Sequence, residues 1–453
     1  MTTSIHHTLL GAAAALLLAS SQIAGAAVSA DEAAKLKATL TPLGGEKAGN
    51  KDGTIPGWEG GITTAVAGPK VGDVPAGLFA NEKPVLQISA KNVSQYAEKL
   101  SDGTQALLKK YPETFRVDVY PSHRTAAAPS WVYENTFKNA TRCKLTDNGL
   151  SVKDCYGGIP FPLPQSGSEV VWNALLRVEA ESIQHGFKNI IGASDGSRTL
   201  GAGGDEWWTF PYYYKDGSAE KWSGKYLLQR FTNTEPPYKA GESLVIHDSI
   251  DPKEPREAWQ YLVGQRRVRR APTVGYDTPD FVASGANYFD EVQGFIGSPD
   301  RYQWKLIGKK ELYIPYNDNG FVTAKVDDAF VQHHLNPDKL RWELHRVWVV
   351  EATVASGKRH AVPKRRYYFD EDSWIPVLVD GYDAQDKLWR TSQVTPFVVP
   401  AIPAVVEKPV VVYNLQAGTM SAVQFLNGTT YKVVARKPEG FYTGDAAAAD
   451  ASR

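Results

Sequence analysis

The sequence lacks several features that would place a protein in a functional class at once. No segment after the N-terminal region reaches the roughly 20 apolar residues that cross a bilayer. The most apolar one, Thr395 to Val406, contains three prolines. A G-x-S-x-G elbow, an H-E-x-x-H motif, a phosphate-binding loop and a dinucleotide fingerprint are also missing. We therefore predict no membrane-integral helix, no cofactor and no catalytic residues.

An excess of one charge is missing too. The 453 residues include 50 Lys and Arg and 50 Asp and Glu, so the formal net charge is zero. Such a chain has no overall attraction to nucleic acid or to an anionic membrane. We expect no nucleic-acid partner, and any charged contact has to be local.

Cysteine is scarce, and its two copies lie close together in the sequence. Cys143 and Cys155 flank a segment that contains the turn residues Asp147, Asn148 and Gly149. In an oxidising compartment this pair predicts a disulfide that closes a hairpin. Two free thiols or a metal-binding pair are the alternatives, and the lack of a neighbouring His or Cys cluster argues against a metal.

The N-terminal region is typical of an export signal. An apolar run from Leu9 to Ala19 is followed by Ala24-Gly25-Ala26, an A-x-A cleavage pattern. We expect residues 1–26 to be a signal peptide, although the preceding MTTSIHH has neither Lys nor Arg; an N-terminal core helix is the alternative. No cysteine follows that could carry a lipid anchor. This predicts a periplasmic protein, with peripheral association to the outer membrane left open.

Most of the remaining chain predicts antiparallel β-structure in a single domain, residues 27–453. Segments rich in β-branched and aromatic residues alternate with turns, and their connections are too short for crossover helices. Strands are expected at residues 115–124, 130–139, 206–215, 224–233, 242–251, 257–270, 302–314, 340–354, 365–383 and 386–399. Helices are expected at residues 31–40 and 92–111 and after a serine cap at position 166 or 168. Residues 44–85 are expected to form an extended arm, so that residues 27–112 make up an N-terminal arm with helices.

Several of the expected strands are apolar on both faces. Residues 225–231 (KYLLQRF) and 373–380 (SWIPVLVD) lack the alternation of a strand with one wet face. We therefore expect the sheet to be covered on both sides, either by helices and the arm or by a bound apolar ligand.

Aromatic residues are abundant, with 12 Trp and 22 Tyr that lie mainly on the expected strands. Such rings line cavities for lipids or sugars, because each combines an apolar face with a polar tip. The alternative is that they fill a large β core. The cavity candidates are Trp259, Tyr261, Trp342, Trp348 and Trp374.

Arginines gather in the segment GQRRVRRAP, at positions 266, 267, 269 and 270. On a regular strand two of them would lie on each face, unless Gly264 introduces a bulge. The cluster fits an anion clamp, because guanidinium groups bind carboxylates and phosphates in pairs of hydrogen bonds. Structural ion pairs with neighbouring Asp and Glu are the alternative. Arg267 and Arg269 are the candidates for the mouth of a cavity.

Histidines and carboxylates give no clear site. His333 and His334 are adjacent and cannot easily share one ion, and His345 and His360 stand apart in the sequence. Carboxylate groups such as Asp370 to Asp372 are interpreted as turn residues, because sequence alone cannot set the spacing that a glycosidase needs. We predict no metal site.

Four blocks of the chain resemble successive signatures of one family. They are LTPLGGEKAGNKDGTIPGWEGG, YPETFRVDVYPSHRTAAAP, WQYLVGQRRVRRAPTVGYDTPDF and RRYYFDEDSWIPVLVDGYDAQDKLWR. Through them the chain resembles the domain of unknown function 1329 family, exported Gram-negative proteins often labelled outer-membrane lipoprotein-sorting protein. The resemblance covers essentially the whole mature chain.

The resemblance implies a mainly β fold with some α-structure, a large antiparallel half-barrel of LolA/LolB type with covering helices and an apolar cavity. It also implies binding or shuttling of a lipid or other hydrophobic molecule, alongside an outer-membrane protein and an efflux-type transporter. It supplies no catalytic or ligand residues, and this chain is much longer than a minimal carrier of that group.

Three functions follow as hypotheses. The favoured one is a non-catalytic carrier with the five aromatic residues in its cavity and the two arginines at its mouth. The second is a scaffold or accessory protein of an envelope transport complex, which predicts an exposed apolar or arginine-rich patch. The third is an enzyme that acts on an envelope glycan or lipid, which predicts a cleft with two facing acids, or an acid with a histidine, and perturbed pKa values. A cavity packed solid would argue against the carrier.

Overall fold

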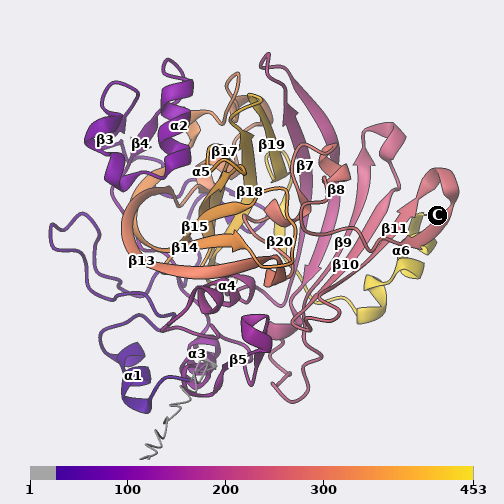
Figure 1. Cartoon of the computed structure of the whole chain (residues 1–453), viewed down its shortest axis with the longest axis horizontal. Helices are drawn as coiled ribbons and strands as arrows, with labels where there is room; N and C mark the ends of the chain where they lie inside the picture. The colour runs from indigo at the N-terminus through magenta and orange to yellow at the C-terminus, as the bar shows by residue number, and fades with distance from the viewer. Residues whose placement is uncertain (1–26, 452–453) are drawn as a thin grey trace, which may run out of the picture.

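One long, curved sheet is the dominant element of the described chain (Figure 1). The computed structural model describes residues 27–451, so the expected signal peptide at residues 1–26 lies outside the described part. The sheet has 16 strands in the order β12-β11-β10-β9-β8-β7-β19-β18-β17-β16-β15-β14-β4-β3, with β13 paired to β14 and β20 to β7. All of these pairs are antiparallel except the short pairing of β14 with β4.

The strands of the sheet in the first part of the chain are β3 (Leu86–Ile88), β4 (Val117–Val119), β7 (Ser182–Gly192), β8 (Arg198–Thr209), β9 (Lys225–Glu235), β10 (Ser243–Ser249), β11 (Arg256–Leu262) and β12 (Arg267–Arg270). The later strands are β13 (Tyr302–Pro315), β14 (Trp342–Val354), β15 (Lys364–Asp370), β16 (Pro376–Tyr382), β17 (Leu388–Val399), β18 (Ala404–Asn414), β19 (Thr419–Phe425) and β20 (Tyr431–Val433). Two small ribbons stand apart, β1 (Lys70–Val71) with β2 (Val74–Pro75) and β5 (Lys144–Thr146) with β6 (Ser151–Lys153).

The α-helices of residues 27–451 are few and short. They are α1 (Ala30–Ala34), α2 (Asp102–Lys110), α3 (Ser130–Arg142), α4 (Gly167–Leu175), α5 (Asn319–Val322) and α6 (Gly444–Ala451). The expected cap of α4 is confirmed, because Ser166 accepts the backbone N–H of Glu169 while the Glu169 side chain accepts the N–H of Ser166. The fold is therefore α+β with a dominant open sheet, as the sequence predicted.

The two faces of the sheet are covered by different parts of the chain. In Figure 1 strands β7 to β11 extend as a broad wing, while β13 to β15 curl tightly on the other side. One face of the wing packs on residues 271–301, which connect β12 to β13 and which we call the cover segment; Phe231, Leu244 and Ile246 meet Val282 and Phe289 there. The opposite face packs on α6. Both faces of the wing, which the sequence predicted to be covered, are therefore covered by other segments of the same chain.

The N-terminal arm is fixed to the curled side through a buried arginine that follows β4. Arg124 donates to the arm carbonyls of Lys47 and Pro56 over 3.4 and 3.5 Å. Arg124 donates two hydrogen bonds, of 2.6 and 2.8 Å, to the carboxylate of Asp372 in the turn between β15 and β16. The indole of Trp374 donates to the carbonyl of Leu43 over 2.9 Å. A side chain at Gly45 would bring its Cβ to 2.5 Å from Asp372, so the arm can lie this close only with glycine there.

Three local predictions were wrong. Residues 130–139, expected as a strand, form α3, because Val132, Thr136 and Ala140 recur at helical spacing and bury one face. Residues 92–101, expected as the start of a helix, form short 3₁₀ turns, and α2 begins only after its cap at Ser101.

The third concerns the arginine segment, expected as one strand through residue 270. The chain reverses at residues 263–266, where Arg266 takes a left-handed conformation with φ 47°. The four arginines therefore lie on a hairpin tip and on β12, an exposed edge strand. Charged residues on an edge strand also discourage pairing with other chains.

The predicted disulfide is confirmed. Cys143 is bonded to Cys155, and the β5–β6 ribbon with its turn at Asp147–Gly149 lies between them. The bridge joins the end of α3 to the segment that leads to α4.

Replacing both cysteines by serine should lower the free energy of unfolding by about 3 kcal/mol, because the bridge joins residues 12 positions apart and closes that loop in the unfolded chain. Urea unfolding of the oxidised wild type and the double variant measures the difference. Equal midpoints for the two proteins would contradict a stabilising role of the bridge.

Candidate functional site

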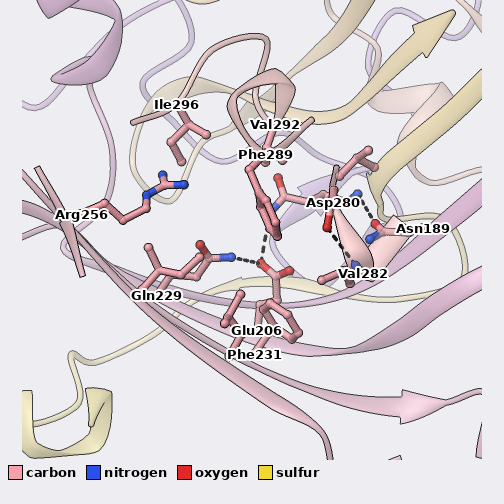
Figure 2. Close-up of a pocket in the computed structure, with 14 residues that line it drawn as sticks. Asn189, Glu206, Gln229, Phe231, Arg256, Asp280, Val282, Phe289, Val292 and Ile296 are labelled. Carbon is pink, nitrogen blue, oxygen red and sulfur yellow. Dashed lines mark hydrogen bonds between the residues drawn. The ribbon is translucent and has the colours of Figure 1, made fainter. Parts of the chain in front are cut away.

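The wing and the cover segment enclose a small cavity (Figure 2). Its floor comes from neighbouring strands in register, since Glu206 on β8 pairs with Phe231 on β9, which pairs with Leu244 on β10. Its roof comes from the cover segment. The lining residues are Asn189, Glu206, Gln229, Phe231, Leu244, Ile246, Arg256, Asp280, Val282, Phe289, Val292, Ile296, Val423 and Gln424.

This cavity is too small for a lipid. Its volume is about 40 Å³, which holds a few water molecules, whereas small-molecule pockets usually measure about 300–1,000 Å³. A ligand could enter the concave face of the wing only if the cover segment moved away. The interior of the half-barrel is therefore closed in this structure.

Glu206 is the most unusual group in the cavity. It is buried and accepts hydrogen bonds from the side chains of Trp208, Gln229 and Gln424. Burial raises the pKa of Glu206 to about 7, although the ammonium of Lys408 and these donors lower it. His185 lies 3.5 Å away, and burial holds the pKa of His185 well below its ordinary value, so it brings no positive charge.

A second and much larger pocket lies on the outer surface. Its volume is about 560 Å³, and we call it the outer pocket. It forms where the end of the α1 segment, the N-terminal arm and α3 meet. Its lining residues are Leu36, Lys37, Leu40, Pro42, Lys47, Trp58, Tyr133, Glu134, Phe137 and Lys138.

Local sequence features build the walls of the outer pocket. The Ser29–Glu32 capping box starts α1, and Leu36 packs against Ala140 of α3. Tyr133 and Phe137 are one helical turn apart, so their rings stand side by side on α3. The Trp58 indole donates to the carbonyl of Ala126 over 2.8 Å, which fixes the ring at the wall.

Charge around the outer pocket is mostly positive. Lys37, Lys47 and Lys138 are exposed at the rim, against one carboxylate, Glu134. The Lys37 ammonium lies 3.9 Å from the centre of the Phe137 ring, a cation–π contact that holds it over the apolar wall. An apolar hollow with a cationic rim suits a molecule with an apolar body and an anionic group.

The comparisons with known proteins place the chain in a family. The profile of the family described as protein of unknown function (DUF1329) matches residues 87–448. The chain belongs to this family. An uncharacterized protein of Pseudomonas aeruginosa, PA3922, is 43% identical over 387 residues, which are 84% of each chain.

Solved structures show weaker likenesses. A domain of Vibrio parahaemolyticus named for outer membrane lipoprotein sorting is 13% identical with a TM-score of 0.43, and the alignment covers 62% of this chain and 97% of that one. The LolA superfamily protein NE2245 of Nitrosomonas europaea is 12% identical with a TM-score of 0.36, over 62% and 100% of the two chains. We draw no functional conclusion from likenesses at this level.

In this DUF1329 protein the aromatic residues singled out in the sequence do not share one cavity. Trp348 and Trp374 lie together under the arm, with ring centres 6.4 Å apart. Trp342 is buried at the start of β14. Trp259 contacts Gly444 of α6, on the face of the wing opposite to the cover segment, and the buried Tyr261 lies two residues further along β11.

The two arginines proposed for the cavity mouth lie elsewhere again. Arg267 and Arg269 are exposed on β12, and they donate to the side chains of Gln265 and Gln260. Of the other two arginines of this segment, Arg266 and Arg270, the second forms an ion pair with Glu257 over 2.8 Å. A ligand role for these seven residues stays a prediction.

Sequence reasoning missed the outer pocket. Its α3 wall was predicted as a strand, and its other wall comes from the N-terminal arm, where little periodicity is present. The apolar side chains along the arm, Trp58 among them, were the available signal.

None of the helices within residues 27–451 is long and apolar enough to cross a membrane.

The raised pKa of Glu206 predicts a pH dependence of stability. Because the folded-state value of about 7 exceeds the ordinary 4.5, the folded protein holds the proton more tightly. The contribution of this group is full below pH 4.5 and is lost as the pH rises through 7, a change of about 3 kcal/mol. Urea unfolding at pH 5 and pH 8 should show this loss in the wild type, and a smaller one in Glu206→Gln.

The exposed Glu113 supplies a control, since Glu113→Gln should keep the wild-type pH dependence. The same difference between pH 5 and pH 8 in the wild type and in Glu206→Gln would contradict the assignment of the titration to Glu206.

Proposed function

We propose that this protein is a periplasmic, non-catalytic binding protein for an anionic amphiphile, such as a fatty acid or an acidic lipid. The observation that carries the proposal is the outer pocket, which has the volume of a ligand site and combines an apolar wall with three lysines. The disulfide supports the proposed periplasmic location, because such bonds persist where the environment is oxidising.

The apolar wall supplies most of the expected affinity. Each buried methylene contributes about 0.8 kcal/mol, so eight methylenes contribute about 6 kcal/mol before the entropic cost of association. Leu36, Trp58 and Phe137 offer such a surface without any rearrangement of the fold.

The lysines are expected to set the orientation of the ligand. Exposed ion pairs contribute less than about 1 kcal/mol each. They therefore select an anionic head group and place it at the rim, while the apolar part of the ligand lies against α3.

The concave face of the wing is the second location for the same ligand class. It is favoured by the apolar contact between the cover segment and the wing, in which Phe289 packs on Phe231 and Leu244. If the cover segment moved away, these side chains would form a second apolar surface. The ligand would then displace protein contacts, which the outer pocket does not require.

A different function is favoured by the exposed arginines of the β11–β12 hairpin. As a cluster on an accessible sheet edge they fit contact with an acidic surface of another envelope protein. A scaffold of this kind, alongside an outer-membrane protein and an efflux-type transporter, is the alternative function that we keep.

Phe137→Ser should weaken binding of a fluorescent fatty acid by at least about tenfold, because a ring at the centre of the wall is lost. Titration followed by fluorescence measures Kd for the wild type and the variant. Tyr238→Ser is the matched control, since Tyr238 is 77% exposed and is not among the lining residues.

Phe289→Ala separates the two locations. It loosens the cover segment, so it should leave Kd unchanged for binding in the outer pocket and should strengthen binding to the concave face. An unchanged Kd in Phe137→Ser would refute the outer pocket as the site.

Replacing Lys37, Lys47 and Lys138 by glutamine together should weaken fatty-acid binding about three- to tenfold and leave binding of the matching fatty alcohol unchanged. Competition of both compounds against the fluorescent probe measures the two effects. Equal weakening for acid and alcohol would show that the lysines do not recognise the anionic group.

A further inference from the structure

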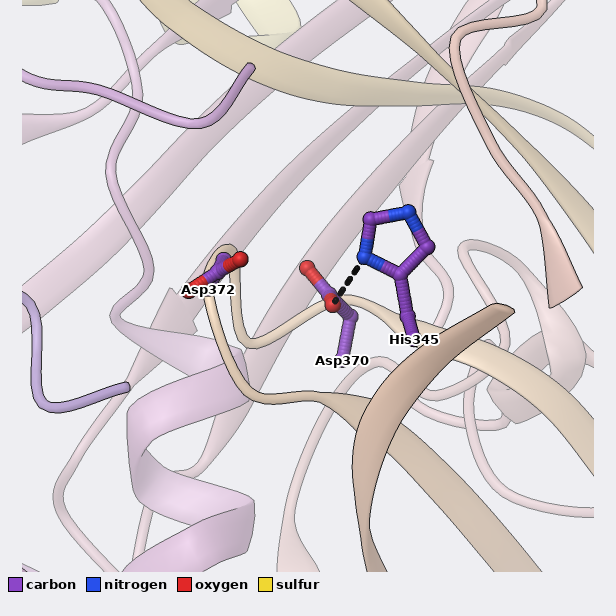
Figure 3. Close-up of side chains that lie close together, drawn as sticks. All are labelled: His345, Asp370 and Asp372. Atoms are coloured by element: carbon purple, nitrogen blue, oxygen red, sulfur yellow. Dashed lines mark ion pairs between the residues drawn. The ribbon is translucent and has the colours of Figure 1, made fainter. Parts of the chain in front are cut away.

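Three side chains with metal-binding atoms meet in the interior beneath the N-terminal arm (Figure 3). His345 comes from β14, and Asp370 and Asp372 come from the end of β15 and the turn that follows. Their nearest nitrogen and oxygen atoms all lie within 4.8 Å of one another, and all three residues are buried. The sheet explains the meeting, because Asp370 pairs with Val347, two residues from His345 and on the same face.

The hydrogen bonds of Glu343 fix how His345 is oriented. The Glu343 carboxylate accepts from the Asn317 side chain over 2.9 Å and from the backbone N–H of His123 over 2.7 Å, and also from Arg341. This carboxylate is therefore held as an acceptor by three donors. His345 Nε2, 3.0 Å away, must therefore donate to it.

With Nε2 as the donor, the other ring nitrogen is turned to the two aspartates. Nδ1 of His345 lies 3.9 Å from Oδ1 of Asp370, too far for a direct hydrogen bond. A histidine that donates one N–H to a carboxylate and turns its other nitrogen to further ligands has the arrangement common in metal sites.

One oxygen of Asp370 lacks a hydrogen-bond partner among residues 27–451. Its Oδ2 accepts from Ser373 and Tyr316, but its Oδ1 is buried and has no hydrogen bond. A buried carboxylate oxygen without a donor is costly unless a cation lies next to it. Figure 3 shows the Asp370 carboxylate directed at the His345 ring.

The surrounding arginine and lysine side chains of the described chain form no ion pair with Oδ1 of Asp370. Arg124 is taken by Asp372 and Glu371, and Lys309 and Arg346 are taken by Glu371 and Glu46. Arg341 is shared by Glu343 and Glu82. These four basic residues therefore serve five other carboxylates, and none of their ion pairs involves Asp370.

We propose that His345 Nδ1, Asp370 Oδ1 and Asp372 bind one divalent transition-metal ion, with Zn²⁺ as the best match to one imidazole and two carboxylates. Bonds of about 2.0–2.2 Å require the three atoms, now within 4.8 Å of one another, to approach to about 3.4 Å, a closure of up to about 1.4 Å by the side chains. Asp372 can keep Arg124 while its remaining lone pairs face the ion. The site is closed to solvent, so its role is to join β14 to the β15–β16 turn rather than to catalyse.

The test is the metal content of the full mature chain, produced without a polyhistidine tag. Mass spectrometry of the elements should find about one equivalent of zinc, and removal by a strong chelator should lower Tm, with Zn²⁺ alone restoring it. Asp370→Asn should reduce the bound zinc at least about tenfold. Asp380→Asn should leave it unchanged, since Asp380 is an equally buried aspartate on the adjacent β16.

A second readout does not depend on the variants. The ¹⁵N shifts of labelled His345 at pH 7 should show one protonated nitrogen, with the other shifted when zinc is added. Two protonated nitrogens would overturn the proposal, because the ring would then be an imidazolium that neutralises Asp370 without a metal. Less than about 0.1 equivalent of zinc after dialysis against Zn²⁺ would overturn it too.

Discussion

The structure depends on one constraint: a long sheet with two apolar faces has to be covered on both. Every residue of β16 is buried, and on β18 all but Asn414 are. Water can solvate neither face of such strands without exposing valine and tyrosine side chains that contribute about 1.5–3 kcal/mol each when buried. The cover segment, α6, α4 and the N-terminal arm are the elements that meet this demand.

The cover explains why the interior is closed and why the accessible hollow lies outside. The cover segment fills the concave side of the wing except for a cavity of about 40 Å³. The place where the sequence predicted a ligand cavity is therefore occupied by the protein's own side chains. The outer pocket arises at a seam instead, where α3, the end of α1 and the arm come together without filling the space between them. Two contacts position its walls: the Trp58 indole donates to the carbonyl of Ala126, and Leu36 packs on α3.

Polar groups in the interior divide into two kinds. In the ionic cluster under the arm each basic residue is paired with carboxylates, and Arg124 joins Asp372 to the arm carbonyls of Lys47 and Pro56. Burial raises the pKa of Glu206 to about 7 although its donors and the ammonium of Lys408 lower it, so its charge depends on pH near neutrality. A buried carboxylate that changes charge in this range, directly under the cover segment, couples the stability of the closed state to pH.

The sequence predicted the sheet well and the site poorly, for physical reasons. Strands such as β9, β10 and β14 were predicted because each is a segment rich in aromatic and β-branched residues that is bounded by turns. The same composition misled the prediction at α3, where Trp131, Val132 and Tyr133 resemble a strand although the buried residues recur every three or four positions. Strands β7, β18 and β19 were missed, because glycines in β7, the Glu-Lys-Pro run in β18 and polar residues in β19 weaken the pattern.

The candidate site could not be found in this way, since no periodicity in the arm shows which residues of α3 it will approach. The same holds for His345, Asp370 and Asp372. Their spacing in sequence is ordinary, and only the register of β14 with β15 brings them together.

The central claim is that the protein binds an anionic amphiphile, and native mass spectrometry of protein isolated from the cell envelope tests it most directly. The account predicts one molecule bound per chain, released by solvent extraction and identified as a fatty acid or acidic lipid. Protein that is free of any apolar molecule, and that also takes up no added fatty acid, would contradict the account and favour the scaffold.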